Sequence, residues 1–376
     1  MQDIKTARFI YTSCQLGAEN ALKGEMARKR PDYHISFSRP GFLTWKIADE
    51  AKIDNPRLVF ARTFIHSLGK ISNKNFPLDR KGKIRETWNI FTKFLLESKL
   101  CSENEPFQTF RLHVWSPDSP KTGSHGVEPG PKTEDLDLHN QLWRDLPVPL
   151  RRFAGYQSDL PESAGKEQEI CLDCVRLSDE EWWLGWHRVE DLHSAYAGGL
   201  LPLALPEDAS SRAWLKFEEG LRWSNFPIGI GSRCVDIGAA PGGGSQVLLS
   251  RGAEVLGVDP AEMDPQILAN PNFTHLRGKI HQLKRNLFRK SRWFIADMNV
   301  APSYTLDVFE EIVMREDIAA RGLLFTLKFF NWKLANELPD FIRRIKSWGF
   351  NHVQARQLQF NRQEIMIAAI KKPFRR

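Results

Sequence analysis

Cysteine is scarce in this chain of 376 residues, with five in all, at positions 14, 101, 171, 174 and 234. This scattered spacing does not indicate a disulfide framework. Cys171 and Cys174 form a single CxxC motif within EICLDCVRLS. A zinc ribbon needs a second cysteine pair, and the sequence has none. We therefore interpret this segment as a strand and predict no metal site.

Long apolar runs are also missing. No stretch approaches the roughly 18 apolar residues that a membrane span requires, and the opening residues MQDIKTARFIYTSC lack the apolar core of a signal peptide. We therefore expect a soluble, cytoplasmic protein that does not bind membranes. Hydrophobic residues make up 41% of the chain and charged residues 26%, as in globular domains with buried cores. The length predicts two or three domains.

Negative charge is in deficit. The formal net charge is +7 and the isoelectric point is about 9.1. A basic balance of this size favours a polyanionic partner such as RNA or DNA, although many basic proteins bind no nucleic acid. Charge alone therefore indicates a class of partner and no particular activity.

The N-terminal half of the chain predicts two α+β segments. In residues 1–75, a strand (ARFIYTSC) and a helix (GAENALKGEMARKR) precede two strands in HISFSRPGFLTWKI, joined by a turn at 39–41. In residues 76–200, helices are expected in IRETWNIFTKFLLES and LDLHNQLWRDL, and strands in FQTFRLHVW and EEWWLGWHR. The Pro- and Gly-rich composition of residues 116–133 predicts a surface insertion. The tryptophans of EEWWLGWHR either stack on bases or, as is more usual, pack in a core.

From about residue 206 to 376 the pattern changes to alternating strands and helices. Strands are expected in CVDIGA, EVLGVD, WFIADM, LLFTLKFF and EIMIAAI, with helices in GGSQVLLSRG, YTLDVFEEIVMREDIAAR and ELPDFIRRIKSWG. This alternation predicts an α/β fold with a doubly wound, largely parallel sheet.

A glycine-rich loop follows the first of these strands, in CVDIGAAPGGGSQVLL. Glycines let the backbone approach a ligand closely, and the start of a helix offers free N–H groups. The spacing does not match the GxGxxG of dinucleotide-binding proteins, which excludes a nicotinamide oxidoreductase. No Walker lysine follows, so the loop is not expected to cradle phosphates.

The motif D-x-G-x-x-P-G-G in this loop resembles motif I of the S-adenosylmethionine-dependent methyltransferases, in the FtsJ-like 2′-O-ribose branch. The resemblance implies S-adenosyl-L-methionine as the cofactor. It implies cofactor-binding roles for Asp236, Gly238, Ala240, Pro241, Gly242, Gly243 and Asp297. Asp259 ends the next strand, where an acidic residue accepts hydrogen bonds from ribose hydroxyls in Rossmann proteins.

The apolar stretch GLLFTLKFFNW contains one lysine, Lys328. An ammonium group is costly to bury without a partner, so we expect Lys328 to have a partner or to reach solvent or a cleft. Lys328 ends its strand, as Asp297 ends another, at the edge where doubly wound folds keep their sites. Glu364 opens a strand that we expect to be antiparallel, which would place it at the same edge. Lys216 lies in the helix-like SRAWLKFEEGL.

FtsJ-like methyltransferases carry a Lys-Asp-Lys-Glu tetrad in this chain order, and Lys216, Asp297, Lys328 and Glu364 match all four types. The resemblance implies that Lys328 is the general base that deprotonates a ribose 2′-hydroxyl. Burial and a second ammonium group nearby, that of Lys216, would lower its pKa toward neutrality. The cofactor's sulfonium is already a good leaving group, so no metal is expected in the reaction.

The wider sequence resembles the large-subunit ribosomal RNA methyltransferase M family. The similarity lies in LPEDASSRAWLKFEEGL, CVDIGAAPGG, VQARQLQFNRQEI, PRLVFART and SCQLGAENALKGEM. It implies a ferredoxin-like domain in 1–75, a THUMP RNA-binding domain in 76–200 and a methyltransferase domain in 206–376. It also implies methylation of a cytidine ribose in 23S ribosomal RNA.

This chain departs from the family pattern at three positions. Gly244 stands where the family has an aromatic residue, and Ala213 stands where it has a serine. Lys279 stands where an acidic residue contacts the adenine side, and a lysine cannot accept a hydrogen bond from the adenine amine. These departures leave open a second reading, a non-catalytic RNA-binding or ribosome-assembly protein. A third reading keeps the enzyme class but places the ribose in another RNA, such as tRNA.

The segment from 277 to 292, RGKIHQLKRNLFRKSR, carries seven Lys or Arg residues and no acid. Such a run predicts a patch that follows RNA phosphates beside the active site, although a solvated surface is the usual alternative. Lys284, Arg285 and Arg289 are the candidate RNA contacts. A monomer is expected.

Overall fold

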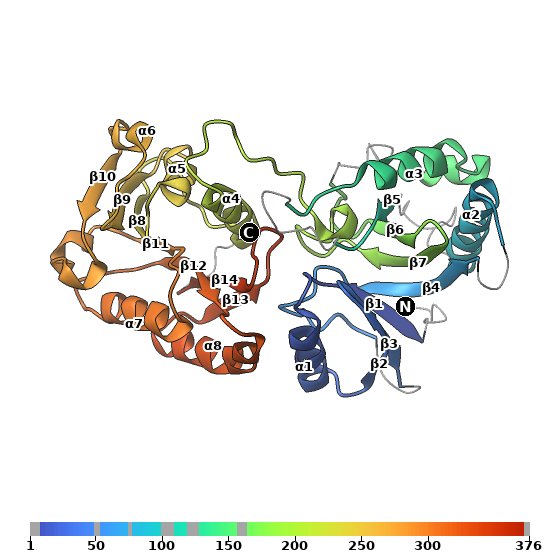
Figure 1. Cartoon of the computed structure of the whole chain (residues 1–376), viewed down its shortest axis with the longest axis horizontal. Helices are drawn as coiled ribbons and strands as arrows, with labels where there is room; N and C mark the ends of the chain where they lie inside the picture. Colours follow the sequence, from blue (N-terminus) through green and yellow to red (C-terminus); the bar gives the residue numbers. More distant parts are fainter. Residues whose placement is uncertain are drawn as a thin grey trace. The chain divides into compact units, whose positions relative to one another are not determined.

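The structure is a computed structural model, and it describes residues 8–48, 53–73, 77–98, 109–118, 128–155 and 164–371. The chain divides into two compact units, Met1–Pro202 and Leu203–Arg376. Each unit is built around its own seven-stranded sheet in the described part of the chain (Figure 1). The predicted mixed α/β class is therefore confirmed.

The N-terminal unit has a mixed sheet with the strand order β2-β3-β1-β4-β7-β6-β5. Its strands are β1 (Phe9–Ser13), β2 (Tyr33–Arg39), β3 (Phe42–Ile47), β4 (Ile65–Ser72), β5 (Phe110–Trp115), β6 (Ile170–Ser178) and β7 (Glu181–Arg188). The pairs are antiparallel except for β5 and β6, which run parallel. The turn predicted at 39–41 joins β2 to β3 as expected.

Helices cover one face of this sheet where β4 to β7 lie. These helices are α2 (Arg80–Glu97) and α3 (Thr133–Arg144). The unit also contains α1 (Glu19–Lys29), which packs near β2, and the 3₁₀ turns η1 (Val148–Phe153) and η2 (Ala197–Gly199). Asp79 caps α2 by accepting a hydrogen bond from the Gly82 backbone N–H at 2.7 Å. Apolar side chains of α2 and α3 share one core with Trp182 and Trp186. These two tryptophans are therefore core residues, while Trp183 is half-buried on the opposite face and stacks on Phe37.

The sheet continues through both segments that the sequence separates at residue 75. β4 pairs with β1 from the first segment and with β7 from the second, so their hydrogen bonds join the two. Of the predicted surface insertion 116–133, residues 119–127 lie outside the described residues. The division into a ferredoxin-like and a THUMP domain thus remains a prediction.

The C-terminal unit has the strand order β10-β9-β8-β11-β12-β14-β13. Its strands are β8 (Arg233–Ile237), β9 (Glu254–Asp259), β10 (Phe273–Arg277), β11 (Trp293–Ala296), β12 (Gly322–Lys328), β13 (His352–Arg356) and β14 (Glu364–Ile370). The first five run parallel, and β14 is antiparallel to both of its neighbours, as expected for the strand that begins at Glu364. The doubly wound prediction is confirmed.

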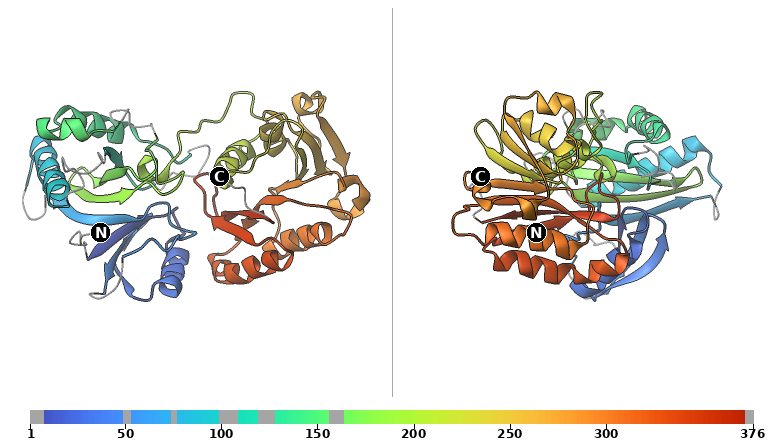
Figure 2. Two further views of the ribbon diagram at one scale, coloured as in Figure 1. Left: turned by 180° about the vertical axis from the view of Figure 1, so that it is seen from behind. Right: turned by 60° about the vertical axis from the view of Figure 1, so that its left-hand side comes forward.

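Helices cover both faces of this second sheet (Figures 1 and 2). They are α4 (Ala213–Ser224), α5 (Gly243–Leu249), α6 (Pro265–Leu268), α7 (Pro302–Val313) and α8 (Leu338–Ser347), with 3₁₀ turns η3 (Ile280–Gln282), η4 (Arg285–Phe288) and η5 (Trp332–Glu337). Figure 1 shows α4 and α5 on one side of the sheet and α7 and α8 on the other. Among the described residues, no helix is both long and apolar enough to span a bilayer.

Candidate active site

The chain order of the C-terminal sheet reverses between β8 and β11. From β8 the chain moves outward through β9 to β10, then returns to place β11 on the other side of β8. In open α/β sheets, ligands bind in the crevice outside the strand C-termini at such a switch point. The glycine loop after β8 and Asp297 after β11 both lie there. An ideal Cβ placed on Gly238 would lie 3.7 Å from the Asp297 carbonyl oxygen.

Four charged side chains form a closed ring at this edge. Lys216 Nζ lies 2.8 Å from Asp297 Oδ2 and 2.8 Å from Glu364 Oε1. Lys328 Nζ lies 2.8 Å from Asp297 Oδ1, and it also pairs with Glu364 Oε2. Each ammonium thus contacts both carboxylates, and each carboxylate uses one oxygen for each ammonium. The structure brings together all four predicted catalytic residues.

Three elements and one loop build the ring. Lys328 ends β12 directly opposite Glu364, the first residue of the antiparallel β14. Asp297 follows β11, the other neighbour of β12. Lys216 projects from the buried face of α4. Thr326 Oγ1 donates to Asp297 Oδ1 at 2.6 Å and helps fix the carboxylate.

The ring is largely buried and its formal charges cancel. The side chains of Lys216, Lys328 and Asp297 are 10%, 16% and 12% exposed, and that of Glu364 is 4% exposed. Buried charges are tolerated when they are paired and hydrogen-bonded in this way. The mutual pairing therefore explains how a lysine can end an apolar strand.

The pKa of Lys328 differs from the sequence-based expectation. Burial alone would lower it, but Glu364 and Asp297 outweigh burial and raise the pKa of Lys328 above its ordinary value. The expected lowering is therefore wrong for this arrangement, because two carboxylates contact the ammonium directly. Burial would raise the pKa of Asp297, but Lys216 and Lys328 hold it well below its usual range.

The glycine loop has a backbone that other residues rarely adopt. Gly238 and Gly242 have φ angles of +77° and +138°, a region that strongly favours glycine. The peptide between Ala240 and Pro241 is cis. Asp259 Oδ2 accepts a hydrogen bond from the Ala240 backbone N–H at 3.1 Å. The half-buried carboxylate that was predicted to bind ribose therefore also ties the loop to the end of β9.

Asp236 has a different setting from the other predicted cofactor residues. Its carboxylate is buried beneath the loop and accepts a hydrogen bond from Ser245 Oγ at 2.8 Å. Burial, the largest contribution, raises the pKa of Asp236 to about 7. Asp236 therefore connects β8 to α5, and its direct role in cofactor binding remains a prediction.

The two glycines that begin α5 allow close packing against α4. A Cβ on Gly243 would lie 2.3 Å from Ser211 Oγ, and a Cβ on Gly244 would lie 2.8 Å from the Phe217 ring. These contacts are too short for any larger residue without movement of the neighbours. In this chain the ring of Phe217 occupies the space beside position 244, where relatives were expected to carry an aromatic side chain.

Sequence reasoning missed two hydroxyl groups beside the loop. Ser210 Oγ and Ser211 Oγ are buried and have no hydrogen-bond partner among the described residues. Ser210 Oγ would lie 3.2 Å from a Cβ on Gly242. An unpaired buried hydroxyl costs about 1–3 kcal/mol, which a polar ligand can recover. The unpaired hydroxyls, the glycine backbone and Asp259 therefore fit a polar cofactor held against this loop.

The predicted RNA contacts lie on the connection from β10 to β11. Lys284 is exposed and has no ion-pair partner among the described residues, whereas Arg289 Nε lies 2.7 Å from Asp317. Asp317 precedes β12, so Arg289 lies at the edge where the strands begin, opposite the edge that holds Lys328. The expected position of the patch beside the active site is therefore wrong for Arg289. Of Arg285, only its backbone position at the start of η4 is described.

Lys279 follows β10 and precedes η3, with its side chain exposed. Its backbone N–H donates to Gln282 Oε1 at 3.1 Å. This arrangement supplies no carboxylate at position 279 for the adenine amine. The other departure, Ala213, begins α4.

Comparisons with known proteins relate the C-terminal unit to a family of enzymes. Residues 209–362 match the family described as FtsJ-like methyltransferase. The C-terminal unit is therefore an FtsJ-like methyltransferase domain, and the predicted cofactor, S-adenosyl-L-methionine, is confirmed at the level of this family.

Over most of its length the chain is similar to proteins named Ribosomal RNA large subunit methyltransferase M, as the sequence motifs predicted. The protein of that name from Pseudoalteromonas translucida is 26% identical over 95% of this chain and 96% of its own length. One from Haemophilus influenzae is 26% identical over 96% of this chain and 98% of its own length. One from Laribacter hongkongensis is 29% identical over 51% of this chain and 54% of its own length.

Proposed function

We propose that this protein transfers a methyl group from S-adenosyl-L-methionine to the 2′-hydroxyl of a ribose in the large-subunit ribosomal RNA. The observation that carries the proposal is the closed ring of Lys216, Asp297, Lys328 and Glu364 beside the glycine loop. An ion-pair ring beside a glycine loop at the ends of parallel strands is an arrangement for moving or holding a proton, which a weak hydroxyl nucleophile needs. The family match and the names of the relatives support the substrate class.

The residues that would hold the cofactor are those of the loop and its surroundings. Gly238 and Gly242 let the loop backbone come close to the cofactor. The unpaired hydroxyls of Ser210 and Ser211 can form hydrogen bonds with it, and Asp259 offers a half-buried carboxylate. The bound cofactor supplies an electrophilic methyl group on a sulfonium, whose positive charge also favours the neutral form of a nearby lysine.

The ring supplies the proton chemistry. The Lys328 side chain has the largest exposed fraction of the four, 16%, so we assign it as the member that meets the ribose. In its neutral form it would accept the 2′-hydroxyl proton, and the bound cofactor would supply the methyl group to that oxygen. Asp297 and Glu364 then stabilise the ammonium that forms, and Lys216 keeps both carboxylates in place. Much of the remaining rate comes from alignment of the reacting atoms.

The same ring gives Lys328 a second candidate role. Because its pKa is raised, Lys328 in the resting ring is an ammonium. An ammonium can donate a hydrogen bond to the ribose oxygen and orient it without accepting a proton. The two roles predict different dependences of the rate on pH.

The remaining assignments complete the proposal. Residues 1–75 form a ferredoxin-like domain and residues 76–200 a THUMP-like RNA-binding domain, which position 23S ribosomal RNA for the methyltransferase domain at 206–376. The protein acts as a cytoplasmic monomer, and the modified nucleotide is a cytidine. The net charge of +7 supports an RNA partner.

Mapping ribose methylation across the ribosomal RNA of cells with and without this protein tests the proposal. The expected result is the loss of one 2′-O-methyl group from the large-subunit RNA, restored by the native protein and not by Lys328→Arg. Loss of a methyl group from a tRNA would move the substrate to that RNA. No change in any RNA, with retained RNA binding, would instead identify a non-catalytic RNA-binding protein.

A further inference from the structure

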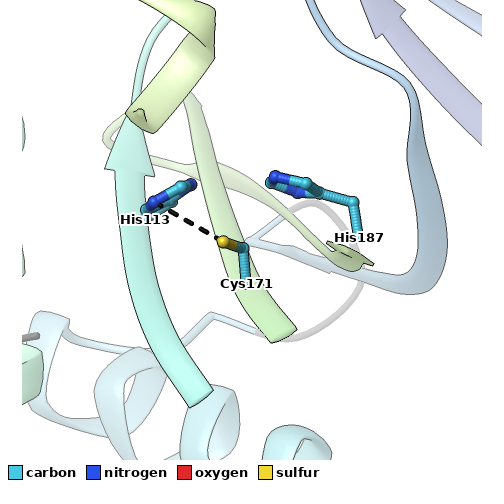
Figure 3. A group of neighbouring side chains, drawn as sticks. All are labelled: His113, Cys171 and His187. Carbon is cyan, nitrogen blue, oxygen red and sulfur yellow. Dashed lines mark hydrogen bonds between the residues drawn. The ribbon is translucent and has the colours of Figure 1, made fainter. Parts of the chain in front are cut away.

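The N-terminal unit contains a buried cluster of side chains that the proposed function does not use. His113, Cys171 and His187 come from the neighbouring strands β5, β6 and β7 (Figure 3). Cys171 stands directly opposite His187 in the β6–β7 pair, and His113 stands opposite Asp173 in the β5–β6 pair. All of these side chains therefore project from the same face of the sheet.

The potential ligand atoms of this cluster are close together. One nitrogen of each histidine and the sulfur of Cys171 lie within 4.8 Å of one another. The distance from Cys171 Sγ to His113 Nε2 is 3.7 Å. In a tetrahedral zinc site with Zn–S of about 2.3 Å and Zn–N of about 2.0–2.1 Å, the distance between a sulfur and a nitrogen ligand is roughly 3.5 Å. The Cys171–His113 pair thus has the separation that a shared zinc ion requires.

A carboxylate already orients one of the histidines. Asp173 Oδ2 accepts a hydrogen bond from His187 Nδ1 at 2.5 Å, and Asp173 Oδ1 accepts one from Trp115 Nε1 at 3.0 Å. A carboxylate that fixes the orientation and tautomer of an imidazole ring is the usual second layer of a zinc site. The carbonyl oxygen of Ser194, which lies 2.8 Å from His187 Nε2, is the candidate fourth ligand.

An unsatisfied polar atom also lies in the cluster. His113 is 2% exposed, and its Nδ1 has no hydrogen-bond partner among the described residues. This nitrogen is not the one that contacts Cys171, which is Nε2, and it lies 3.9 Å from Asp173 Oδ1. With Nε2 as the zinc ligand, Nδ1 would therefore be the nitrogen nearest to the orienting carboxylate. The cluster is closed from the other side by Val189, Ala195 and the partly buried Tyr196, which pack against Cys171. A structural zinc site is closed to solvent in the same way.

Zinc binding displaces protons from its ligands. Cysteine binds zinc as the thiolate and histidine as the neutral imidazole, so any proton that Cys171 or His187 loses on binding is released to solvent.

We propose that His113, Cys171 and His187 bind a structural zinc ion in the N-terminal unit, with Asp173 as the carboxylate that orients His187. Thiolate and imidazole ligands together suit zinc among the common divalent ions. The ion would link three strands of the sheet and so stabilise the unit. This proposal is independent of the methyltransferase function.

Spacing in the sequence points to the wrong cysteine partner. Cys171 and Cys174 form the CxxC motif, but residues three apart in a strand project to opposite faces. Cys174 packs in the core beneath α2 and α3, on the far side of the sheet from Cys171. The proposed partners of Cys171 are histidines 58 residues before it and 16 residues after it, which no spacing rule connects.

The test is the metal content of the full-length chain, purified without a histidine tag from zinc-supplemented cells. We expect about one zinc ion per chain by elemental analysis, as for one closed site. After exchange with Co²⁺, a charge-transfer absorption band should report a cobalt–thiolate bond. Cys174→Ser is the matched control, because it removes a buried thiol from the same strand and should keep both signals.

Three variants sharpen the result. Cys171→Ser should lose the charge-transfer band and most of the zinc, and His113→Gln should lose most of the zinc. Asp173→Asn should weaken zinc binding by about 10–100-fold, as expected for a residue that orients a ligand. If the variants do not fold, the native chain decides: no zinc and no cobalt–thiolate band would overturn the proposal. Equal zinc in Cys171→Ser and the native chain would overturn it as well.

Discussion

Lys328, the last residue of β12, stands directly opposite Glu364, the first residue of β14, and their side chains form an ion pair at the edge of the sheet where the parallel strands end. This pairing exists because β14 runs antiparallel to β12. The start of one strand and the end of the other then meet at the same edge of the sheet. Asp297 and Lys216 complete the ring on the other side of Lys328, with each contact at 2.8 Å.

Replacement of Lys328 by arginine should abolish methyl transfer and retain cofactor binding. Arginine keeps the positive charge that the two carboxylates need, but it cannot be deprotonated in a protein. We expect turnover to fall by about 10²–10⁴-fold, the usual contribution of a general acid–base group. Transfer of a radiolabelled methyl group to RNA and calorimetry with S-adenosylmethionine measure the two properties. Near-normal turnover in this variant would exclude Lys328 as the base.

The rate of methyl transfer should rise with pH. The pKa of Lys328 lies above its ordinary value, so only a small neutral fraction exists near pH 7. If the neutral form is the base, the rate at saturating substrates should increase about tenfold per pH unit between roughly pH 7 and 9. A profile that stays flat over this interval would instead show that Lys328 acts as an ammonium that orients the ribose.

Asp236→Asn should remove part of the dependence of stability on pH. The pKa of Asp236 is raised to about 7 in the folded chain, compared with about 3.9 for an unperturbed aspartate. A raised pKa gives a contribution to stability that is complete below the unfolded-state value and is lost as pH rises through the folded-state value. The native chain should therefore lose unfolding free energy from about pH 4 to 7 through this group.

Urea unfolding of the native chain and the asparagine variant at several pH values between 4 and 8 checks this expectation. As pH rises from 4 to 8, the unfolding free energy of the variant should increase relative to that of the native chain. An asparagine can still accept the hydrogen bond from Ser245 Oγ, which keeps the comparison simple. A difference that does not change with pH would contradict the assignment.

RNA binding should weaken with salt, and Lys284→Ala should make the salt dependence shallower. Loss of one phosphate contact reduces the slope of log affinity against log salt by about 1. Arg289→Ala should have a smaller effect, because Asp317 already pairs with Arg289 at 2.7 Å. Lys346→Ala, an exposed lysine on α8, is the control and should leave the slope unchanged. An unchanged slope in the Lys284 variant would place the RNA elsewhere.

The parts of the fold that could be predicted from sequence are those with strong local patterns. The alternation from CVDIGA to EIMIAAI correctly predicts β8, β9, β11, β12 and β14 and the helices α5, α7 and α8. The strands β4, β10 and β13 were missed, because short edge or half-exposed strands carry little periodicity. The pairing of β4 with β7 joins residues more than one hundred positions apart and leaves no local signal.

The candidate site shows the same limit. Residue types and strand ends sufficed to select Lys216, Asp297, Lys328 and Glu364, and the structure places them in contact. The direction of the Lys328 pKa was missed, because it depends on which charges come closest to the ammonium. Two carboxylates contact Lys328 directly, so their effect exceeds those of burial and of the second lysine. Only the distances between the four groups show whether burial or the carboxylates have the larger effect on the pKa of Lys328.

The continuous N-terminal sheet limits how this protein can be taken apart. A cut near residue 75 would separate β4 from β7 and leave both fragments with an unpaired strand edge, which invites aggregation. A cut between Pro202 and Leu203 leaves every described strand with its neighbours. Grafts that join this N-terminal half to a different enzyme therefore have one natural junction, and it lies just ahead of the methyltransferase domain.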